Sequence, residues 1–350
     1  MLKILHTADF HIGAGFTSFG EKLAINAENL QFLAISTMIN YANVNEIDAI
    51  LIAGDTFDNH VVDFQKRAKL FSILAKFERE IFIVCGNHDY YFKGSFWDHT
   101  EIPQNITLIK TNEWQTFEFE KYTLFGASFT NIYEKIEFSG INLSQNKINI
   151  GLVHADILTD SQYNPLSKTA IKNSKLDYIA VGHNHKFSEI LKVSDTYFSA
   201  PGNISATGFD EMSAKGFIVA KFDENGSNYE FVSSKGLEIL NHELDISFYA
   251  SVLDIRYTLQ KKAHQNIFLN LSLVGINNFQ LDIDELENCL KEDFFAVNIE
   301  DSTDKPENLW RFIDEDNLLG EFTRIMRVRY DKGEKEVLTA LKLGLDSLIF

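Results

Sequence analysis

The chain has 350 residues, of which 45% are hydrophobic and 13% aromatic, which excludes intrinsic disorder and supplies enough apolar surface for a sizeable core. Lys and Arg number 32 against 50 Asp and Glu, so the net charge is -18, the wrong sign for non-specific adhesion to nucleic acid or to an anionic membrane. The length exceeds that of one typical domain, so we expect a large domain with an appendage, or two domains.

Cysteine content and hydropathy bear on the cellular compartment. The two cysteines, Cys85 and Cys289, are too few for a disulfide framework and too far apart for a cysteine-based zinc finger. No run approaches the roughly 18 apolar residues of a membrane span, and residues 1–9 are typical of an opening β-strand rather than of a signal peptide. We therefore expect a cytoplasmic protein with no membrane association.

The first 235 residues alternate short apolar runs with amphipathic stretches. In chain order, this pattern predicts two helices, Glu21–Asn43 and Val61–Glu78, among the strands Ile4–Ala8, Ala49–Ala53, Ile81–Cys85, Thr123–Ala127, Ile148–His154 and Tyr178–Val181. Such an alternation predicts an α/β domain. His6 lies inside the first strand and is either a core histidine or a hydrogen-bonding partner of the site.

The pattern changes near Ser233–Gly236. Beyond it, the sequence predicts a small α+β domain with a strand at Ile267–Val274, a helix at Asp282–Lys291 and a strand at Phe295–Ile299. Residues 318–350 predict two helices separated near Asp331–Gly333, and the last helix carries an apolar stripe that either packs on its own domain or is offered to a partner. We therefore divide the chain at 1–236, 237–302 and 303–350.

Five polar clusters each follow an apolar run, and they contain five of the ten histidines. They are Asp9-Phe10-His11, Gly54-Asp55-Thr56-Phe57-Asp58, Gly86-Asn87-His88-Asp89, Val153-His154-Ala155 and Gly182-His183-Asn184-His185. Sites in open α/β sheets gather beyond the carboxyl ends of the strands, so we expect the five clusters to lie together. Alternate residues of an extended segment point to one side, so Asp9 with His11 can face one point.

The residue types in these clusters indicate metal chemistry. Carboxylate oxygens, imidazole nitrogens and one amide oxygen suit two divalent ions such as Mn²⁺, Fe²⁺ or Zn²⁺, and the lack of thiolates argues against a structural zinc. Two ions roughly 3.5–4 Å apart can share one carboxylate, for which Asp55 is the natural candidate, hold a hydroxide between them and clamp a phosphoryl group for in-line attack. His88, next to the predicted ligand Asn87, is suited to act as general acid at the leaving oxygen.

The five motifs in this order resemble those of the calcineurin-like metallophosphoesterases, and more narrowly those of the SbcD-type nucleases of DNA double-strand-break repair. A further stretch, Ser199-Ala200-Pro201-Gly202-Asn203 with Gly208-Phe209-Asp210-Glu211 and Lys215-Gly216-Phe217, resembles the segment after the last histidine pair in that subfamily. The phosphoesterase resemblance covers about residues 1–220, and the nuclease resemblance rests on fewer residues.

The resemblance implies a four-layer α/β/β/α sandwich at 1–236, a smaller α+β cap at 237–302, and terminal helices that dock on an SbcC-type coiled-coil P-loop ATPase. It implies two metal sites that share one aspartate: Asp9, His11, Asp55 and His185 hold one ion, and Asp55, Asn87, His154 and His183 hold the other. His88 matches the catalytic histidine. Some relatives carry a histidine where this chain has Asp58, which we include with His88 as a catalytic residue. A homodimer through the helix at 61–78 is also implied.

We therefore expect a Mn²⁺-dependent phosphodiesterase that acts on DNA as an exonuclease or endonuclease in repair, with the bridging hydroxide as nucleophile and His88 assisting the leaving group. Two alternatives stay open: a phosphatase or phosphodiesterase for a small substrate such as a nucleotide, and a chiefly architectural subunit whose terminal helices recruit the ATPase. The loop Tyr90–Trp97 either stacks on unpaired bases or belongs to the core, and His60 either lies in solvent or contacts substrate. The acidic composition predicts weak, salt-sensitive DNA binding by the isolated chain.

Overall fold

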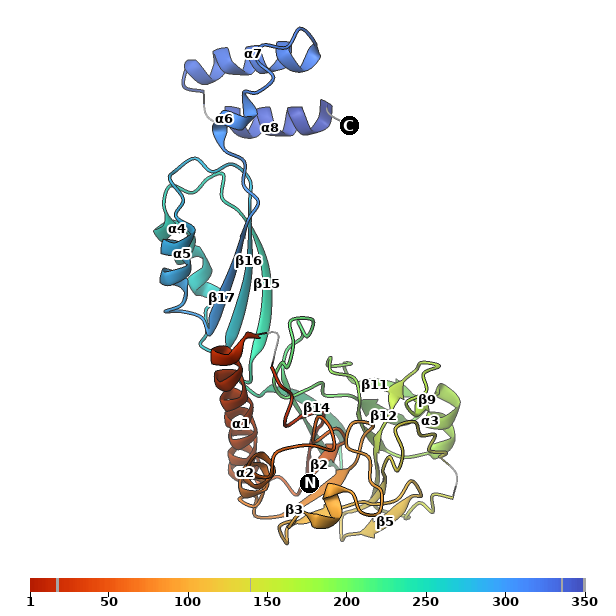
Figure 1. Cartoon of the computed structure of the whole chain (residues 1–350). Coiled ribbons are helices and arrows are strands. Elements are labelled where there is room, and N and C mark those ends of the chain that lie inside the picture. Colours follow the sequence, from red (N-terminus) through yellow and green to blue (C-terminus); the bar gives the residue numbers. More distant parts are fainter. Residues whose placement is uncertain (17–18, 139, 335, 349–350) are drawn as a thin grey trace. The chain divides into compact units, whose positions relative to one another are not determined.

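The computed structural model describes residues 1–16, 19–138, 140–334 and 336–348. The chain divides into two compact units, Met1–Glu238 and Ile239–Phe350 (Figure 1). The predicted boundaries at residues 236 and 302 stay predictions. None of the helices in the described ranges is long and apolar enough to cross a membrane.

Two six-stranded sheets form the first unit. In spatial order, the first sheet contains β14 (Gly226–Ser233), β13 (Gly216–Asp223), β1 (Leu2–Thr7), β2 (Ala49–Ala53), β3 (Glu80–Val84) and β4 (Ile106–Leu108). The second contains β11 (Leu191–Val193), β12 (Thr196–Ser199), β10 (Tyr178–Gly182), β7 (Ile148–His154), β6 (Tyr122–Ala127) and β5 (Gln115–Glu118). Strands β1, β2 and β3 pair in parallel, as do β7 and β10, so the carboxyl ends within each group share one edge.

Alternating side chains of the strands build three apolar layers. Ile4 and Leu51 share the cluster between the two sheets with Leu152 and Ala180. The residues next to them in β1 and β2 belong to a cluster that also contains side chains of α1 (Glu21–Val44) and α2 (Phe64–Leu74). The other face of the second sheet packs against α3 (Lys168–Ser174). The expected four-layer α/β/β/α fold is therefore confirmed.

The predicted strands and helices of this unit are confirmed to within a few residues, except at α2. The predicted range Val61–Glu78 is too long at both ends. The Asp63 side chain accepts hydrogen bonds from the N–H groups of Gln65 and Lys66 and so caps the start of the helix. After Leu74 the backbone continues in turns, in which the N–H groups of Lys76 and Phe77 donate to residues three positions earlier. The prediction also lacks the hairpin β13–β14, which joins the first sheet by antiparallel pairing with β1. A short parallel pair, β8 (Asp156–Ile157) and β9 (Pro165–Leu166), and the 3₁₀ helix η2 (Phe96–His99) complete the unit.

The second unit has a three-stranded sheet of β15 (Glu238–Asp245), β16 (Ile267–Val274) and β17 (Ala296–Asp301). Its apolar face packs against α4 (Val252–Leu259), which continues into η3 (Gln260–Lys262), and α5 (Ile283–Leu290). The helices α6 (Pro306–Leu309), α7 (Leu318–Asp331) and α8 (Val337–Leu348) share a separate cluster. The predicted α+β composition and terminal helices are thus confirmed.

The apolar stripe of α8 packs within its own unit. Val337, Leu341 and Leu345 are buried against side chains of α6 and α7. Leu348, at the end of the stripe, is exposed, as is Leu343 on another face of the helix. Ile349 and Phe350, which end the predicted helix, lie outside the described residues.

Candidate metal centre

The nine predicted site residues all lie at or just beyond the carboxyl ends of five strands, β1, β2, β3, β7 and β10. The structure brings ligand atoms of eight of them, all but Asn87, into three groups, each within 4.8 Å: Asp9, His11 and His185; Asp55, His154 and His183; and His11, Asp58 and His88. Since these residues come from strands of both sheets, the groups form only where the sheets pack together and the carboxyl ends of their strands meet.

The backbone at this edge is strained. Positive φ angles, which residues other than glycine rarely adopt, occur at four site residues: Asp9 (52°), His11 (46°), Asp55 (46°) and His183 (83°). Such outliers cluster at functional sites, because the surrounding structure must hold them in place. Gly86 allows a further close approach, since a methyl group on it would overlap Oδ1 of Asp55.

The carboxylates of Asp9 and Asp55 each use one oxygen to accept a hydrogen bond from a backbone N–H. The backbone N–H of His183 donates to Asp9 Oδ1 over 3.0 Å, and the backbone N–H of His88 donates to Asp55 Oδ1 over 2.9 Å. The second oxygen of Asp55, Oδ2, lies 3.7 Å from His11 Nε2 and 3.4 Å from His154 Nε2. Asp55 Oδ2 therefore faces imidazoles of both ligand groups.

Polar atoms of the first group are left without partners. Asp9 Oδ2 and His11 Nε2 are buried and make no hydrogen bond among the described residues. His11 Nδ1 lies 3.4 Å from Asp58 Oδ1, so this nitrogen can donate to the carboxylate and leave the lone pair on Nε2. An unpaired buried polar atom costs about 1–3 kcal/mol, and a cation between these two atoms would satisfy both.

The second group converges on one point. His154 Nδ1 donates to the carbonyl oxygen of Ala53 over 2.9 Å, so in the neutral imidazole, the form that binds a metal ion, Nε2 carries the lone pair. That Nε2 lies 3.0 Å from Asn87 Oδ1 and 3.2 Å from His183 Nδ1, and these last two atoms are 3.1 Å apart. A proton on one of the two imidazole nitrogens can form only one of these three contacts. The other contacts then bring lone pairs together, and a cation bound between the three atoms would satisfy them.

Three aspartates give the centre a negative electrostatic potential. Burial opposes the charged form of His11, but Asp58, Asp55 and Asp9 outweigh it and raise the pKa of His11 to about 9. In the same way, Asp55 and Asp9 overcome the burial of His154 and raise its pKa to about 9. Positive charge is therefore stabilised at this centre.

His88 lies at the exposed side of the centre. Its Nδ1 is 2.8 Å from the backbone carbonyl oxygen of Asp58, which can only accept, so Nδ1 carries the proton. The Asp58 side chain points to His11 instead. The pKa of Asp58 is lowered by the hydrogen bond with His11, and burial opposes this only in part.

Two acidic residues outside the nine predicted ones, Asp89 and Glu211, also contact the centre. The Asp89 carboxylate accepts from the N–H groups of Gly86 (2.8 Å) and Phe57 (3.1 Å), and so links the segments after β2 and β3. Glu211 Oε1 lies 2.6 Å from His185 Nδ1. Asp89 could have been found from its place in the third cluster, whereas Glu211 lies too far along the chain from His185 for any spacing rule.

The residues with two open interpretations are now placed. His6 is a core histidine: its Nε2 lies 3.1 Å from the Val181 carbonyl oxygen and its Nδ1 lies 2.8 Å from the Tyr178 hydroxyl. Of the aromatic loop, Trp97 belongs to the core, whereas Phe92 is 43% exposed. The His60 ring contacts Tyr90, with the ring centroids 4.4 Å apart, rather than lying free in solvent.

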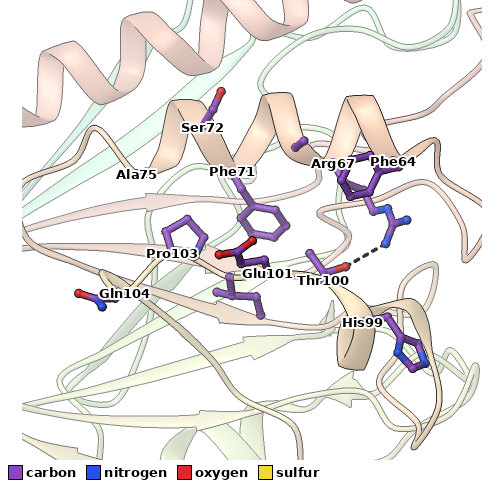
Figure 2. A pocket seen from close by; sticks show the side chains of 12 residues that line it. Phe64, Arg67, Phe71, Ser72, Ala75, His99, Thr100, Glu101, Pro103 and Gln104 are labelled. Carbon is purple, nitrogen blue, oxygen red and sulfur yellow. Dashed lines mark hydrogen bonds between the residues drawn. The ribbon is translucent and has the colours of Figure 1, made fainter.

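Two cavities of similar size differ in their relation to the centre. One, of about 490 Å³, lies between α2 and the segment 99–104, where Arg67 donates to the Thr100 hydroxyl over 2.9 Å (Figure 2). None of the nine predicted site residues lines it. The other, of about 430 Å³, is lined by His185, Lys186 and residues 210–213 and so adjoins the centre.

Comparisons with known proteins identify the family of this chain. The sequence model of the calcineurin-like phosphoesterases matches residues 2–187. The chain is 26% identical over 254 residues to the uncharacterized metallophosphoesterase YhaO of Bacillus subtilis, covering 66% of this chain and 60% of that protein. It is 22% identical over 314 residues to the SbcD subunit of the nuclease SbcCD of Staphylococcus epidermidis, covering 79% of this chain and 80% of that subunit. The corresponding subunit of Rhodobacter capsulatus is 36% identical over 93 residues, 25% of this chain and 22% of that subunit.

Similar solved structures include TT1561 of Thermus thermophilus, with a TM-score of 0.41 and 12% identity over 67% of this chain and 99% of that one. GAP50 of Plasmodium has a TM-score of 0.41 and 13% identity over 67% of this chain and 85% of that one. The family assignment rests on the sequence match, which spans more than half of the chain and all the strands that carry the five clusters. The chain belongs to the calcineurin-like phosphoesterase family.

Proposed function

We propose that this phosphoesterase holds two divalent metal ions and hydrolyses phosphodiester bonds of DNA. The observation that carries the proposal is the position of Asp55 Oδ2, 3.7 Å from His11 Nε2 and 3.4 Å from His154 Nε2, which suits a carboxylate shared by two ions. The unpaired atoms Asp9 Oδ2 and His11 Nε2 support the fit of a cation.

The ligand set follows the two groups of side chains. One ion would be held by Asp9, His11, Asp55 and His185, and the other by Asp55, Asn87, His154 and His183. Mn²⁺ is the proposed native metal, with Fe²⁺ or Zn²⁺ as alternatives, because a mixed oxygen and nitrogen donor set without thiolates suits all three. When bound, such a pair supplies Lewis-acid polarisation and charge neutralisation at a phosphoryl group.

The protein's own side chains provide proton transfer and positioning. With Nδ1 donating to the Asp58 carbonyl, His88 presents Nε2 as the nitrogen that can hold a proton for the departing sugar oxygen. Asp58 would act through its neighbours, its carboxylate orienting His11 and its carbonyl orienting His88. We therefore assign Asp58 a positioning role and His88 the catalytic one.

DNA as substrate is supported by the similarity to the SbcD subunit of the Staphylococcus epidermidis nuclease SbcCD, which extends over 79% of this chain. The same similarity supports an SbcC-type coiled-coil ATPase as partner, bound through residues 303–350, with residues 237–302 as a cap. A homodimer and a cytoplasmic location are parts of the same proposal. A named nuclease subunit is a closer guide to the substrate than the fold, since one fold serves many reactions.

A nuclease assay tests the proposal. Purified full-length protein with Mn²⁺ should degrade DNA, whereas Asp55→Ala and His88→Ala should not, and His99→Ala should be unaffected because it removes an exposed imidazole outside the ligand groups. Inertness toward single- and double-stranded DNA with Mn²⁺, Mg²⁺, Fe²⁺ and Zn²⁺, with and without the ATPase, would overturn the assignment. Hydrolysis of nucleotides alone would favour the small-substrate alternative.

A further inference from the structure

A segment further along the chain holds His185 at both its backbone and its ring. The N–H of Asn203 donates to the His185 carbonyl oxygen over 3.2 Å, while His185 Nδ1 lies 2.6 Å from Glu211 Oε1. Gly202 has a φ of 77°, and a side chain on it would come within 2.8 Å of the same carbonyl oxygen. Only glycine therefore lets the segment approach His185 so closely.

The Glu211 carboxylate is itself held by surrounding donors. Its Oε2 accepts from Asn203 Nδ2 over 2.6 Å and from the Thr207 N–H over 2.8 Å. Lys215, which is fully buried, donates to Asn203 Oδ1 over 2.6 Å, and its Nζ lies 3.7 Å from Glu211 Oε2. Because these neighbours all donate, Glu211 is a fixed acceptor for His185 Nδ1–H.

This contact differs from those that support the other imidazoles. His154 Nδ1 is held by a neutral backbone carbonyl at 2.9 Å, and His11 Nδ1 lies 3.4 Å from the carboxylate of Asp58, whose side chain is 33% exposed. The Glu211 contact is shorter, at 2.6 Å, and its side chain is only 9% exposed. Of the three, His185 thus has the most rigid charged support.

We propose that Glu211 is a positioning residue of the metal centre, which, held by Asn203 and Lys215, keeps His185 protonated on Nδ1 with Nε2 turned to a divalent ion. The inference rests on the proposed function, in which His185 is a ligand. A carboxylate that accepts the second N–H of a ligating imidazole fixes the tautomer and ring orientation and makes the ligand nitrogen more basic. The assignment also gives a role to the residues around Glu211: Gly202 allows the close approach to His185, and Asn203 and Lys215 hold the Glu211 carboxylate.

Mn²⁺ binding to the full-length protein tests this role. Free Mn²⁺ is counted by electron paramagnetic resonance during a titration of wild type, of Glu211→Gln and of Asp210→Asn, the matched control that changes the exposed neighbouring charge. We expect Glu211→Gln to weaken binding of one ion by about 10- to 100-fold and Asp210→Asn to leave it unchanged. Equal affinity in Glu211→Gln and wild type would overturn the assignment.

A double-mutant cycle separates positioning from a general effect on the fold. Because Glu211 acts through His185, the Glu211→Gln change should have no further effect on Mn²⁺ binding in the His185→Ala background. An undiminished effect there would contradict the inference. Absence of Mn²⁺ binding by the wild type would instead refute the proposed metal centre as a whole.

The tautomer of His185 provides a readout without metal. In ¹⁵N-edited spectra of the metal-free protein, His185 should carry its proton on Nδ1, and Glu211→Ala should shift it toward the mixture found in free imidazole. Thermal unfolding shows whether each variant is folded. If Glu211→Gln is unfolded, Glu211→Asp is used instead, because the shorter side chain keeps the charge but cannot reach His185 Nδ1 at 2.6 Å without strain. A wild-type proton on Nε2 would overturn the inference.

Discussion

The ring of His88 is held by the backbone of Asp58, with Nδ1 of the histidine 2.8 Å from the carbonyl oxygen of the aspartate. The side chain of Asp58 points the other way, and its Oδ1 lies 3.4 Å from His11 Nδ1. One residue thus supports the proposed catalytic histidine through its main chain and a proposed ligand histidine through its carboxylate. Substitution of the side chain can separate these two contributions.

His88→Ala should lower turnover without loss of metal. A general acid contributes about 10²- to 10⁴-fold to rate, and we expect a loss of that size in kcat for DNA hydrolysis. The His88 imidazole donates to the backbone carbonyl of Asp58 and not to a ligand side chain, and the backbone N–H of residue 88 that holds Asp55 remains in the variant. Because no contact to a ligand is lost, Mn²⁺ affinity should stay within about twofold of wild type. Single-turnover kinetics and Mn²⁺ titration measure the two quantities. A collapse of Mn²⁺ binding would show that His88 is a ligand.

Asp58→Asn should have the opposite effect. The amide keeps the size of the side chain but removes the charge that faces His11, while the carbonyl that holds His88 is unchanged. We expect Mn²⁺ affinity to fall by about 10-fold or more, and kcat at saturating Mn²⁺ to change little. Asp160→Asn, the same change at an exposed aspartate outside the ligand groups, is the control. A fall in kcat that Mn²⁺ does not restore would assign Asp58 a direct part in catalysis.

Lys215→Met should destabilise the first unit severely. The lysine is fully buried beside Glu211 and Asn203, and removal of one partner leaves a buried charge uncompensated, at a cost of about 3–5 kcal/mol in the free energy of unfolding. Lys221→Met removes an exposed partner of Glu230 on the neighbouring strand and should cost at most about 1 kcal/mol. Urea unfolding of the metal-free protein compares the two. Equal losses would mean that the buried network contributes no more than a surface pair.

His6 should make the fold sensitive to acid. Burial lowers its pKa to about 3, and the hydrogen bond to the Val181 carbonyl opposes this only in part. An unfolded chain takes up a proton at this residue near its ordinary pKa of 6.5, while the folded chain does not, so stability is complete above 6.5 and is lost as the pH falls toward 3. The loss approaches about 1.4 kcal/mol per pH unit within this window.

The substitution His6→Gln removes that proton uptake. Metal-free wild type and variant should therefore differ in how steeply the free energy of unfolding falls between about pH 6 and 4, with the variant showing the shallower slope by about 1.4 kcal/mol per pH unit. Parallel curves for wild type and His6→Gln would show that His6 is not kept neutral by the fold.

Local patterns in the sequence predicted the strands that carry the centre, because a buried strand requires an apolar run whatever surrounds it. Strands β2 and β7 have the predicted bounds, and the clusters that follow the strands contain the nine predicted site residues. The start of α2 was missed because a single capping side chain, Asp63, overrides helix periodicity there. Local sequence was thus enough to specify which side chains are available at the edge of the sheets.

Long-range packing sets how each imidazole is held. His154 is oriented by the carbonyl of Ala53, 101 residues away, and His185 by Glu211, 26 residues away. No helical or strand period spans such separations, so no spacing in the chain predicts these contacts. They form because the packing of the two sheets and the close approach at Gly202 bring distant backbone together. The identity of the candidate ligands is therefore local information, whereas their orientation depends on the packing of the whole first unit.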